Sequence, residues 1–233
     1  MKALLLAAGR ATRLGDLSLT APKCLQRLGD EPLLDRLIQQ LSAAGVEEFL
    51  VNTHHLAPMV QNHIQSRNDH SRFTVVYEPE LLGTLGTLRA NSGFFNRQPG
   101  WVLHADNYIS GTLLGLREGF DLRPPECVGA MLTFSTDYPS ACGVALTDEK
   151  GIVTAFFEKK PDPPSNEASA ATFIFDDRVI SRLDQIPKDK TDISHDLLPY
   201  LLNRIVTVPH CGKIVDIGTR EGLVRARALA QTE

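Results

Sequence analysis

Short apolar runs alternate with helix-like segments through the first half of the chain, and this alternation restricts the fold more than any other feature. Residues 3–8 are apolar throughout, as in a strand that is buried on both faces. Residues 32–44 carry Leu and Ile at helical spacing, and Gly45 follows them, which is typical of a helix end. The alternation predicts an α/β fold with a mainly parallel central sheet and helices on both sides.

The same patterns indicate the remaining elements. Further strands are expected at 46–51, 73–77, 101–104, 128–135, 143–147, 152–157 and 172–175, and further helices at 57–65, 84–91, 194–203 and 219–230. Residues 148–151 read Asp-Glu-Lys-Gly, a turn signal that predicts a hairpin between the strands on either side. No linker rich in Gly, Ser or Pro divides the chain, which predicts a single domain over residues 1–233.

Composition excludes several classes of partner. The 233 residues carry a formal net charge of −4, whereas general nucleic-acid binders usually have a basic surplus. No apolar run approaches the roughly 20 residues that a membrane helix needs. The cysteines lie far apart with no C-x-x-C pair, which predicts reduced thiols and a cytoplasmic protein; they are Cys24, Cys127, Cys142 and Cys211. We therefore expect neither a nucleic-acid nor a membrane partner.

The first strand runs directly into Gly9-Arg10-Ala11-Thr12-Arg13-Leu14-Gly15. Ligands of open α/β sheets bind at the carboxyl ends of strands, and a glycine there lets a ligand approach the backbone. Backbone N–H groups and arginine side chains suit phosphate oxygens, and Lys23 could return to the same site. Neither G-x-x-x-x-G-K-[ST] nor G-x-G-x-x-G is present, which disfavours a P-loop and a dinucleotide oxidoreductase. From these residues alone, Arg10 and Arg13 could equally be solvated surface charges.

A longer pattern extends this loop. Leu5-Leu6-Ala7-Ala8-Gly9, then Arg13-Leu14, then Ala21-Pro22-Lys23 resembles the signature of the nucleoside-diphosphate-sugar pyrophosphorylases, which are sugar-1-phosphate nucleotidylyltransferases. The resemblance implies a three-layer, Rossmann-like fold with a mixed, mainly parallel sheet and a small antiparallel sugar-binding part. It also implies a set of nucleotide-binding residues, namely Leu6, Ala7, Ala8, Gly9, Arg10, Ala11 and Thr12.

Two residues of this loop depart from the family pattern. Ala11 stands where the family usually has glycine, and Asp16 where it has proline. Alanine tolerates a positive φ less well than glycine, at a cost of about 1 kcal/mol. We expect a slightly shifted loop that still binds its ligand.

Three later segments fit the same family. Residues 80–88 resemble its L-G-T-A-G-A-L segment, which implies that Gly83 and Thr84 contact the nucleobase. An alternative interpretation, compatible with the first, is that Thr84 is the N-cap of a helix. Residues 102–107 resemble the strand that ends in G-D, and residues 214–219 resemble D-I-G-T-P-E. By this resemblance Asp106 and Asp216 would bind Mg²⁺, which prefers carboxylates, phosphates and water. Taken singly, each aspartate is more typical of a cap or turn.

The second half of the chain supplies the implied sugar site. Residues 156–161 resemble F-x-E-K-P, so Lys159 would hold the sugar phosphate and Glu158 the sugar hydroxyls. Gly143 matches a glycine whose backbone faces the sugar, and Ala170 and Ala171 lie where the family has N-A-G. The family asparagine is replaced by Ser169 or Ala170, which leaves the identity of the sugar open.

The resemblance implies the reaction of an NTP with a sugar 1-phosphate to give an NDP-sugar and pyrophosphate, with Arg13, Lys23, Asp106 and Lys159 as catalytic residues. It also implies a nucleotide-binding half at about residues 1–110 and a sugar-binding half at about 111–233. The chain looks most like short bacterial mannose- or manno-heptose-1-phosphate guanylyltransferases, which favours GTP. Transfer of another nucleotide to another phosphorylated acceptor, or a silent nucleotide-binding subunit, are the alternatives. We expect no second catalytic domain, and homodimerisation stays open.

Overall fold

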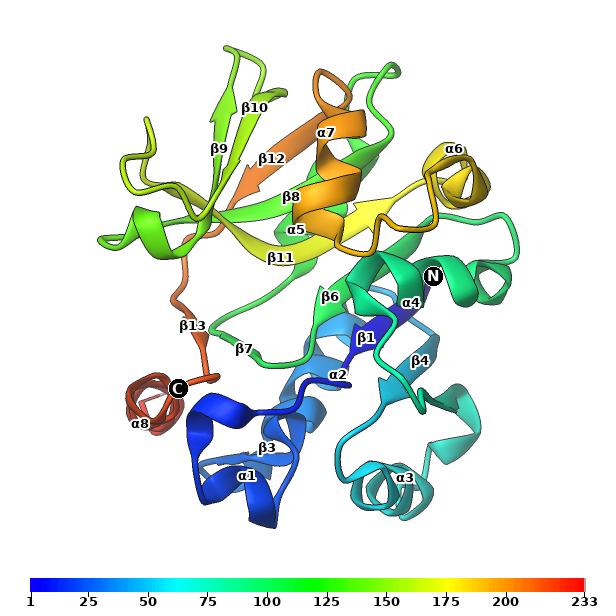
Figure 1. Cartoon of the computed structure of the whole chain (residues 1–233), viewed down its shortest axis with the longest axis vertical. Helices are drawn as coiled ribbons and strands as arrows, with labels where there is room; N and C mark the ends of the chain where they lie inside the picture. The colour runs from blue at the N-terminus through cyan, green and yellow to red at the C-terminus, as the bar shows by residue number, and fades with distance from the viewer. Residues whose placement is uncertain (233) are drawn as a thin grey trace. The chain divides into compact units, whose positions relative to one another are not determined.

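The computed structural model describes residues 1–232 and divides them into two compact units. Unit 1 contains Met1–Leu81, Leu103–Leu113 and the segment from Gly212 onward. Unit 2 contains Leu82–Val102 and Leu114–Cys211. Each unit is therefore built from segments that are far apart in the sequence, as the colours in Figure 1 show.

Unit 1 is built on parallel strands (Figure 1). They pair in the order β1 (Lys2–Leu6), β4 (Glu48–Thr53) and β5 (Phe73–Tyr77). The last two residues of β6 (Gly100–His104) also belong to unit 1, and the Ala105 N–H that follows them donates to the Leu6 carbonyl at 3.0 Å. Leu6 and His104 thus end at the same edge of the sheet, the edge where ligands of such sheets bind.

The long helices of unit 1 follow the sequence patterns closely. They are α2 (Leu33–Ala43), α3 (Ala57–Gln65) and α8 (Arg220–Ala230). Helix α2 buries its predicted apolar face, and Gly45 has φ +87°, the left-handed conformation expected after a helix end. The Val46 N–H then donates to the Leu41 carbonyl at 2.9 Å, which turns the chain toward β4.

Several shorter elements of unit 1 are absent from the sequence prediction, because they are too short to show a period. They are η1 (Thr12–Leu14), α1 (Leu17–Thr20), η2 (Lys23–Leu25), β2 (Arg27–Leu28), β3 (Glu31–Pro32), η3 (His70–Arg72), β7 (Asn107–Ile109) and β13 (Ile214–Asp216). Strand β13 pairs antiparallel with β7, so the segment after Gly212 is tied to the loop that follows β6.

Unit 2 contains the antiparallel part of the fold (Figure 1). Its strands are β8 (Gly129–Ser135), β9 (Gly143–Thr147), β10 (Val153–Glu158), β11 (Glu167–Phe175) and β12 (Ile205–Pro209). The predicted hairpin is confirmed, since β9 pairs antiparallel with β10 and the turn carries Gly151 at φ +74°. Strand β11 pairs antiparallel with β8 and β9, whereas β12 pairs parallel with β8.

For two elements of unit 2 the sequence patterns predicted the wrong bounds. Strand β11 begins at Glu167 rather than 172, because a bulge between Ser169 and Phe173 interrupts its alternation. The expected helix at 194–203 is instead a π-helical turn at Ile193–Leu197 followed by α7 (Leu198–Leu201). The other helical segments of unit 2 are α4 (Gly83–Ala90), η4 (Ser92–Phe95), α5 (Leu114–Asp121), η5 (Pro139–Ala141), α6 (Asp177–Ile180) and η6 (Leu183–Gln185).

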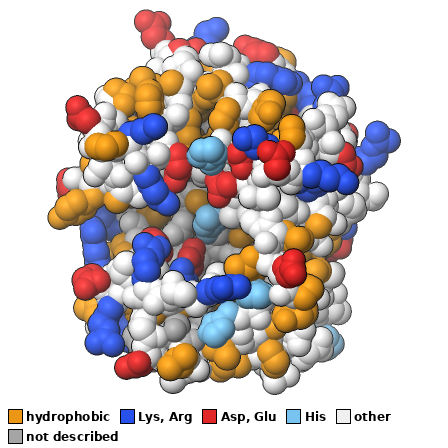
Figure 2. Space-filling model, in the orientation of Figure 1, with side chains coloured by type: hydrophobic (Ala, Val, Ile, Leu, Met, Phe, Trp, Pro, Cys, Tyr) orange, Lys and Arg blue, Asp and Glu red, His pale blue; other side chains and the backbone are white. Residues whose placement is uncertain are grey.

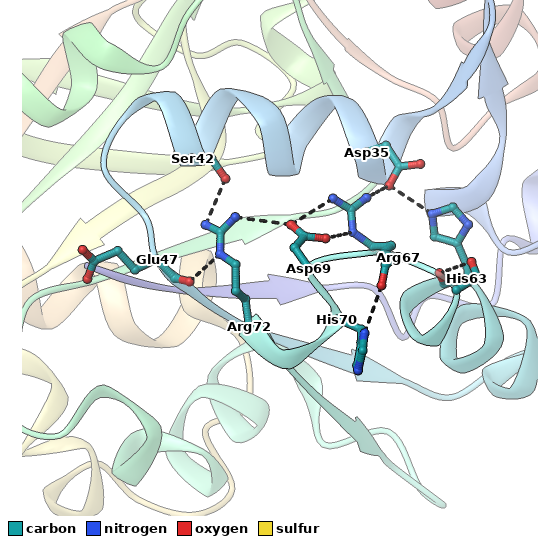
Figure 3. A network of polar contacts seen from close by, with 9 residues as sticks. Asp35, Ser42, Glu47, His63, Arg67, Asp69, His70 and Arg72 are labelled. Atoms are coloured by element: carbon teal, nitrogen blue, oxygen red, sulfur yellow. Dashed lines mark hydrogen bonds and ion pairs between the residues drawn. The ribbon is translucent and has the colours of Figure 1, made fainter.

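A polar network in unit 1 links α2 to α3 and to the turn that precedes β5 (Figure 3). Asp35 on α2 accepts a hydrogen bond from Arg67 and lies 3.0 Å from the His63 imidazole. Arg67 also contacts Asp69 at 2.9 Å, and Arg72 contacts the same carboxylate at 3.3 Å. Partial burial acts to raise the pKa of Asp69, but the bonds and charges of Arg67 and Arg72 outweigh it and hold that pKa below its ordinary value.

This network predicts a pH-dependent contribution to stability. A carboxyl whose folded pKa is depressed stabilises the fold above its unfolded pKa and loses that contribution as the pH falls through the folded pKa. Asp69→Asn should therefore lower the free energy of unfolding by about 1 kcal/mol at neutral pH, and by progressively less as the pH falls through the lowered folded pKa of Asp69. Urea unfolding of both proteins across this range measures the difference. A loss of unfolding free energy in Asp69→Asn that does not change with pH would contradict a lowered folded pKa for Asp69.

The thiols and the charged surface agree with the composition. All the cysteines are free; Cys24 and Cys127 are buried, and Cys211 is exposed. Figure 2 shows basic and acidic side chains interspersed on the face that it draws, which fits the net charge of −4. Among residues 1–232, no helix has the length and apolar character that crossing a membrane requires.

Candidate functional site

The loop after β1 presents its backbone at the edge of the unit 1 sheet. Ala8 and Ala11 are 7% and 3% exposed, so their side chains point into the protein. Ala11 has φ +56°, which confirms that this position needs the conformation that favours glycine. Gly9, Arg10 and Thr12 are exposed. The loop therefore offers a ligand main-chain groups and the side chains of these exposed residues.

The start of this loop is held by a buried pair that the sequence did not single out. Asn52, at the end of β4, accepts a hydrogen bond from the Ala7 N–H at 2.7 Å through its side-chain oxygen. Its amide donates to Glu78 at 2.9 Å, and both side chains are 3% exposed. A polar residue directly after an apolar strand was the only available signal. Asn52 thus fixes where the main chain turns after β1.

Replacement of Asn52 should be among the more destabilising changes in unit 1. Asn52→Leu would leave the Ala7 N–H and the Glu78 carboxylate without this buried partner, and each loss costs about 1–3 kcal/mol. We expect a clear fall in the thermal unfolding midpoint, measured by circular dichroism. Asn62→Leu, at an exposed position on α3, is the matched control. Equal thermal unfolding midpoints for Asn52→Leu and Asn62→Leu would exclude a role of Asn52 in holding the main chain after β1.

The structure brings Lys23 and Asp106 together. The Lys23 ammonium lies 2.8 Å from the Asp106 carboxylate, and the two side chains are 13% and 24% exposed. A Cβ built on Gly9 would lie 3.9 Å from the same ammonium, so Lys23 does return to the loop after β1. Asp106 lies two residues beyond the end of β6, next to the strand end that the sequence pattern predicted.

Asp106 is held in its ionised form. Burial acts to raise the pKa of its carboxyl, but the Lys23 ammonium and the His104 imidazole, 3.9 Å away, outweigh it and lower that pKa below its usual range. Next to Lys23, burial and the Asp106 charge raise the pKa of the Cys24 thiol to about 12, which makes it unreactive. The site thus presents a carboxylate and an ammonium without a competing thiolate.

A second pair lies in the same unit. Arg13 approaches Asp216 at 3.4 Å, and the Gly218 N–H donates to the Asp216 carboxylate at 2.6 Å. A Cβ on Gly218 would lie 2.9 Å from the Arg13 guanidinium, so only glycine fits here without a shift. The pairing of β13 with β7 sets Asp216 opposite Asn107, and the Ile217 N–H donates to the Asp106 carbonyl at 3.0 Å. The two predicted aspartates are therefore neighbours.

The donor set in unit 1 fits a hard divalent cation. Asp106 and Asp216 offer carboxylate oxygens, the ligands that Mg²⁺ prefers, while Lys23 and Arg13 supply charge for phosphates. Among residues 1–232, no group of three or more His, Cys, Asp or Glu residues has the arrangement of a metal site. Mg²⁺ usually takes phosphate and water oxygens beside one or two carboxylates.

In unit 2, the predicted base-binding residues open helix α4. Gly83 is its first residue, with φ +75°, and the N-cap is Leu82. The alternative interpretation of Thr84 as the N-cap was wrong. Its hydroxyl donates to Asp192 at 3.3 Å and accepts from the Ile193 N–H at 2.8 Å. With the hydroxyl so engaged, a nucleobase would meet mainly the backbone of this turn.

Other predicted residues of unit 2 lie on the hairpin. The β9–β10 pairing sets Gly143 opposite Glu158, and a Cβ on Gly143 would lie 2.5 Å from the Glu158 carboxylate. Lys159 has φ +48°, and its N–H donates to the Cys142 carbonyl at 3.0 Å. Its ammonium lies 3.4 Å from Glu158, and its side chain is 67% exposed. Gly143, Glu158 and Lys159 therefore form one group.

The bulge in β11 contains the last two predicted residues. Ala170 is 1% exposed, so its methyl group points into the core. Ala171 has φ +49°, and its N–H donates to the Ser169 hydroxyl at 3.1 Å. Ala171 thus takes the backbone conformation that favours glycine. Contacts of Ala170 with a ligand would have to come from its main chain.

A mixed sheet flanked by helices, with a glycine loop, two cations and two carboxylates at a strand edge, is typical of α/β proteins that bind phosphorylated ligands. Comparison with known sequences identifies the group within this class. The chain belongs to the nucleotidyl transferase family, whose model matches residues 2–233.

Named relatives are similar over most of the chain. It is 29% identical over 231 residues to the mannose-1-phosphate guanylyltransferase of Mycobacterium tuberculosis, covering 97% of this chain and 63% of the relative. It is 26% identical over 223 residues to the mannose-1-phosphate guanylyltransferase catalytic subunit beta of Drosophila melanogaster, covering 93% of this chain and 59% of the relative. The chain thus spans about three fifths of the length of these relatives.

Solved structures share the fold. A UDP-glucose pyrophosphorylase complexed with UDP-glucose superposes with a TM-score of 0.84 at 21% identity, covering 99% of this chain and 98% of that one. HddC from Yersinia pseudotuberculosis superposes with a TM-score of 0.80 at 21% identity, covering 98% of each chain. The expected α/β nucleotidyltransferase fold with a mixed sheet is confirmed.

Proposed function

We propose that the chain transfers a nucleoside monophosphate from an NTP to a sugar 1-phosphate, giving an NDP-sugar and pyrophosphate. The observation that carries the proposal is the pair of neighbouring aspartates, each with its own cation, beside the glycine loop of unit 1. Two carboxylates next to a triphosphate would repel it unless cations lie between them. Lys23 and Arg13 supply two of these cations, and Asp106 and Asp216 would hold a Mg²⁺ ion as a third.

The chemistry requires positioning and charge neutralisation rather than a strong base. A phosphate oxygen of the sugar 1-phosphate is already anionic, and it forms a bond to the α-phosphorus while the bond from that phosphorus to the bridging oxygen breaks. Pyrophosphate leaves with the electron pair. Lys23 would stabilise charge on the transferring group, and Arg13 would hold the leaving pyrophosphate. When bound, Mg²⁺ would neutralise phosphate charge in the same place.

Unit 2 supplies the proposed recognition groups. Lys159 would bind the phosphate of the sugar and Glu158 its hydroxyl groups, with the Gly143, Ala170 and Ala171 backbones beside them. The backbone of Gly83 and Thr84 would contact the nucleobase. The names of the relatives support GTP and mannose 1-phosphate as the substrate pair. Free thiols on all four cysteines support the cytoplasm as the compartment.

The test is pyrophosphate release by the purified protein with Mg²⁺. GTP, UTP, dTTP, CTP and ATP would each be paired with mannose 1-phosphate, with glucose 1-phosphate and with buffer. We expect release that needs both substrates and is fastest with GTP and mannose 1-phosphate. Release without a sugar phosphate would refute transfer. Tight NTP binding by calorimetry with no release from any pair, including a wider set of phosphorylated acceptors, would favour a silent nucleotide-binding subunit.

A further inference from the structure

Helix α4 has no capping side chain at its N-terminus, and its first N–H groups donate instead to a distant segment of unit 2. The first N–H groups of any helix have no partner within the helix. At α4, the Leu85 and Gly86 N–H groups donate to the Thr191 carbonyl, at 2.8 and 3.4 Å. A Cβ on Gly83 would lie 2.5 Å from this same carbonyl oxygen. The main chain at Thr191 therefore packs closely against the first turn of α4.

The side chain of Thr84 joins the same turn to Asp192 and Ile193, the next two residues of the distant segment. The Thr84 hydroxyl accepts from the Ile193 N–H at 2.8 Å and donates to Asp192 at 3.3 Å. Together with the Thr191 carbonyl, these contacts tie the first turn of α4 to residues 191–193 along its length. We name this arrangement the α4 clamp.

The clamp is itself ordered by one buried carboxylate. Oδ2 of Asp196 accepts from the Thr191 and Asp192 N–H groups, at 2.8 and 2.9 Å. Its other oxygen lies 3.1 Å from the His195 imidazole and 3.5 Å from the Lys190 ammonium. The residue is 9% exposed. These groups surround the carboxylate with donors and positive charge.

The ionised form of Asp196 is strongly favoured. Burial acts to raise the pKa of its carboxyl, but the Asp192 and Thr191 N–H groups, His195 and Lys190 outweigh it and hold that pKa well below its usual range. Asp196 therefore carries its charge at any pH at which an enzyme assay is run. A neutral amide at this position could not pair equally well with two N–H groups, the His195 imidazole and the Lys190 ammonium.

We propose that Asp196 is a positioning residue for nucleotide recognition: it orders residues 191–193, which in turn fix the Gly83–Thr84 backbone. The inference rests on the proposed function, which assigns that backbone to the nucleobase. A turn that is already fixed before binding loses less conformational freedom when the ligand arrives. Loss of Asp196 thus weakens NTP binding and leaves the sugar phosphate site on the β9–β10 hairpin intact.

The test compares Asp196→Asn with Asp189→Asn, a change of the same charge at an exposed residue in the same loop. We expect Asp196→Asn to raise KM for the NTP about tenfold. KM for the sugar phosphate should not change, and Asp189→Asn should behave as wild type. Thr84→Val, which removes the clamp hydroxyl, should raise KM for the NTP in the same way. An unchanged KM for the NTP, or equal rises in both KM values, would overturn the proposal.

A second readout separates the clamp from the proposed function. Hydrogen exchange at the Leu85 and Gly86 amides, without any ligand, should be faster in Asp196→Asn than in wild type, and calorimetry should show weaker GTP binding. Unchanged exchange, or unchanged affinity while wild type binds GTP, would refute the clamp alone. Wild-type protein that binds no NTP would instead refute the proposed function, and the assignment of the clamp to nucleotide recognition with it.

Discussion

Asp106→Asn protein should transfer nucleotide about 10²–10³ times more slowly than wild type while folding normally. The amide keeps the shape of the carboxylate and can still accept a hydrogen bond from Lys23, 2.8 Å away. It removes the negative charge that would hold Mg²⁺ and that now balances the Lys23 ammonium. Initial rates of pyrophosphate release at saturating substrates give the effect on kcat, and circular dichroism checks the fold.

Asp30→Asn is the control for this variant, because Asp30 is exposed in the turn between β2 and β3. It should keep wild-type rates. Raising the Mg²⁺ concentration should recover part of the lost rate in Asp106→Asn if weaker metal binding causes it. A folded Asp106→Asn protein with near wild-type turnover at low Mg²⁺ would exclude Asp106 as a metal ligand.

Arg13→Gln should lose a similar factor of about 10²–10³ in rate with almost no loss of stability. The side chain is 64% exposed, and its contact with Asp216 is 3.4 Å long. Exposed pairs of this kind contribute about 0–1 kcal/mol to folding. A large kinetic effect combined with an unchanged unfolding midpoint therefore separates a role toward the leaving pyrophosphate from a role in the fold.

Arg182→Gln, at an exposed position of unit 2, is the matched control and should change neither rate nor midpoint. The sensitivity of Arg13→Gln to inhibition by the product is informative as well. If Arg13 holds pyrophosphate, the variant should also be inhibited less by added pyrophosphate. A rate of Arg13→Gln within a factor of about three of wild type would favour the alternative that Arg13 is a solvated surface charge.

Local sequence patterns predicted the larger elements well. Helix α3 and strands β5 and β9 have the predicted bounds. The loop after the first strand and the neighbouring Asp106 and Asp216 also follow from residues that match a family pattern in order. The conformation of Ala11 was predictable from a single rule, since the position needs a positive φ whichever residue occupies it.

The bracing residues could not be predicted in this way. Asn52 holds Ala7 from a different strand, and Asp196 holds a turn whose contact with α4 spans more than a hundred residues of sequence. Neither residue belongs to a periodic pattern or a short motif, so its role becomes visible only in the folded chain. The π-helical turn at Ile193–Leu197 shows the same limit, because the surrounding residues look like an ordinary helix.

The most direct test of the proposed reaction is a ³¹P NMR time course of GTP, mannose 1-phosphate and Mg²⁺ with the purified protein. Nucleotidyl transfer predicts that the phosphate monoester signal of the sugar falls while a diphosphate diester and free pyrophosphate grow in equal amounts. Asp106→Asn should show the same products at a much lower rate. Release of inorganic phosphate, or pyrophosphate formed while mannose 1-phosphate and every other sugar phosphate tested remain unchanged, would contradict the reaction.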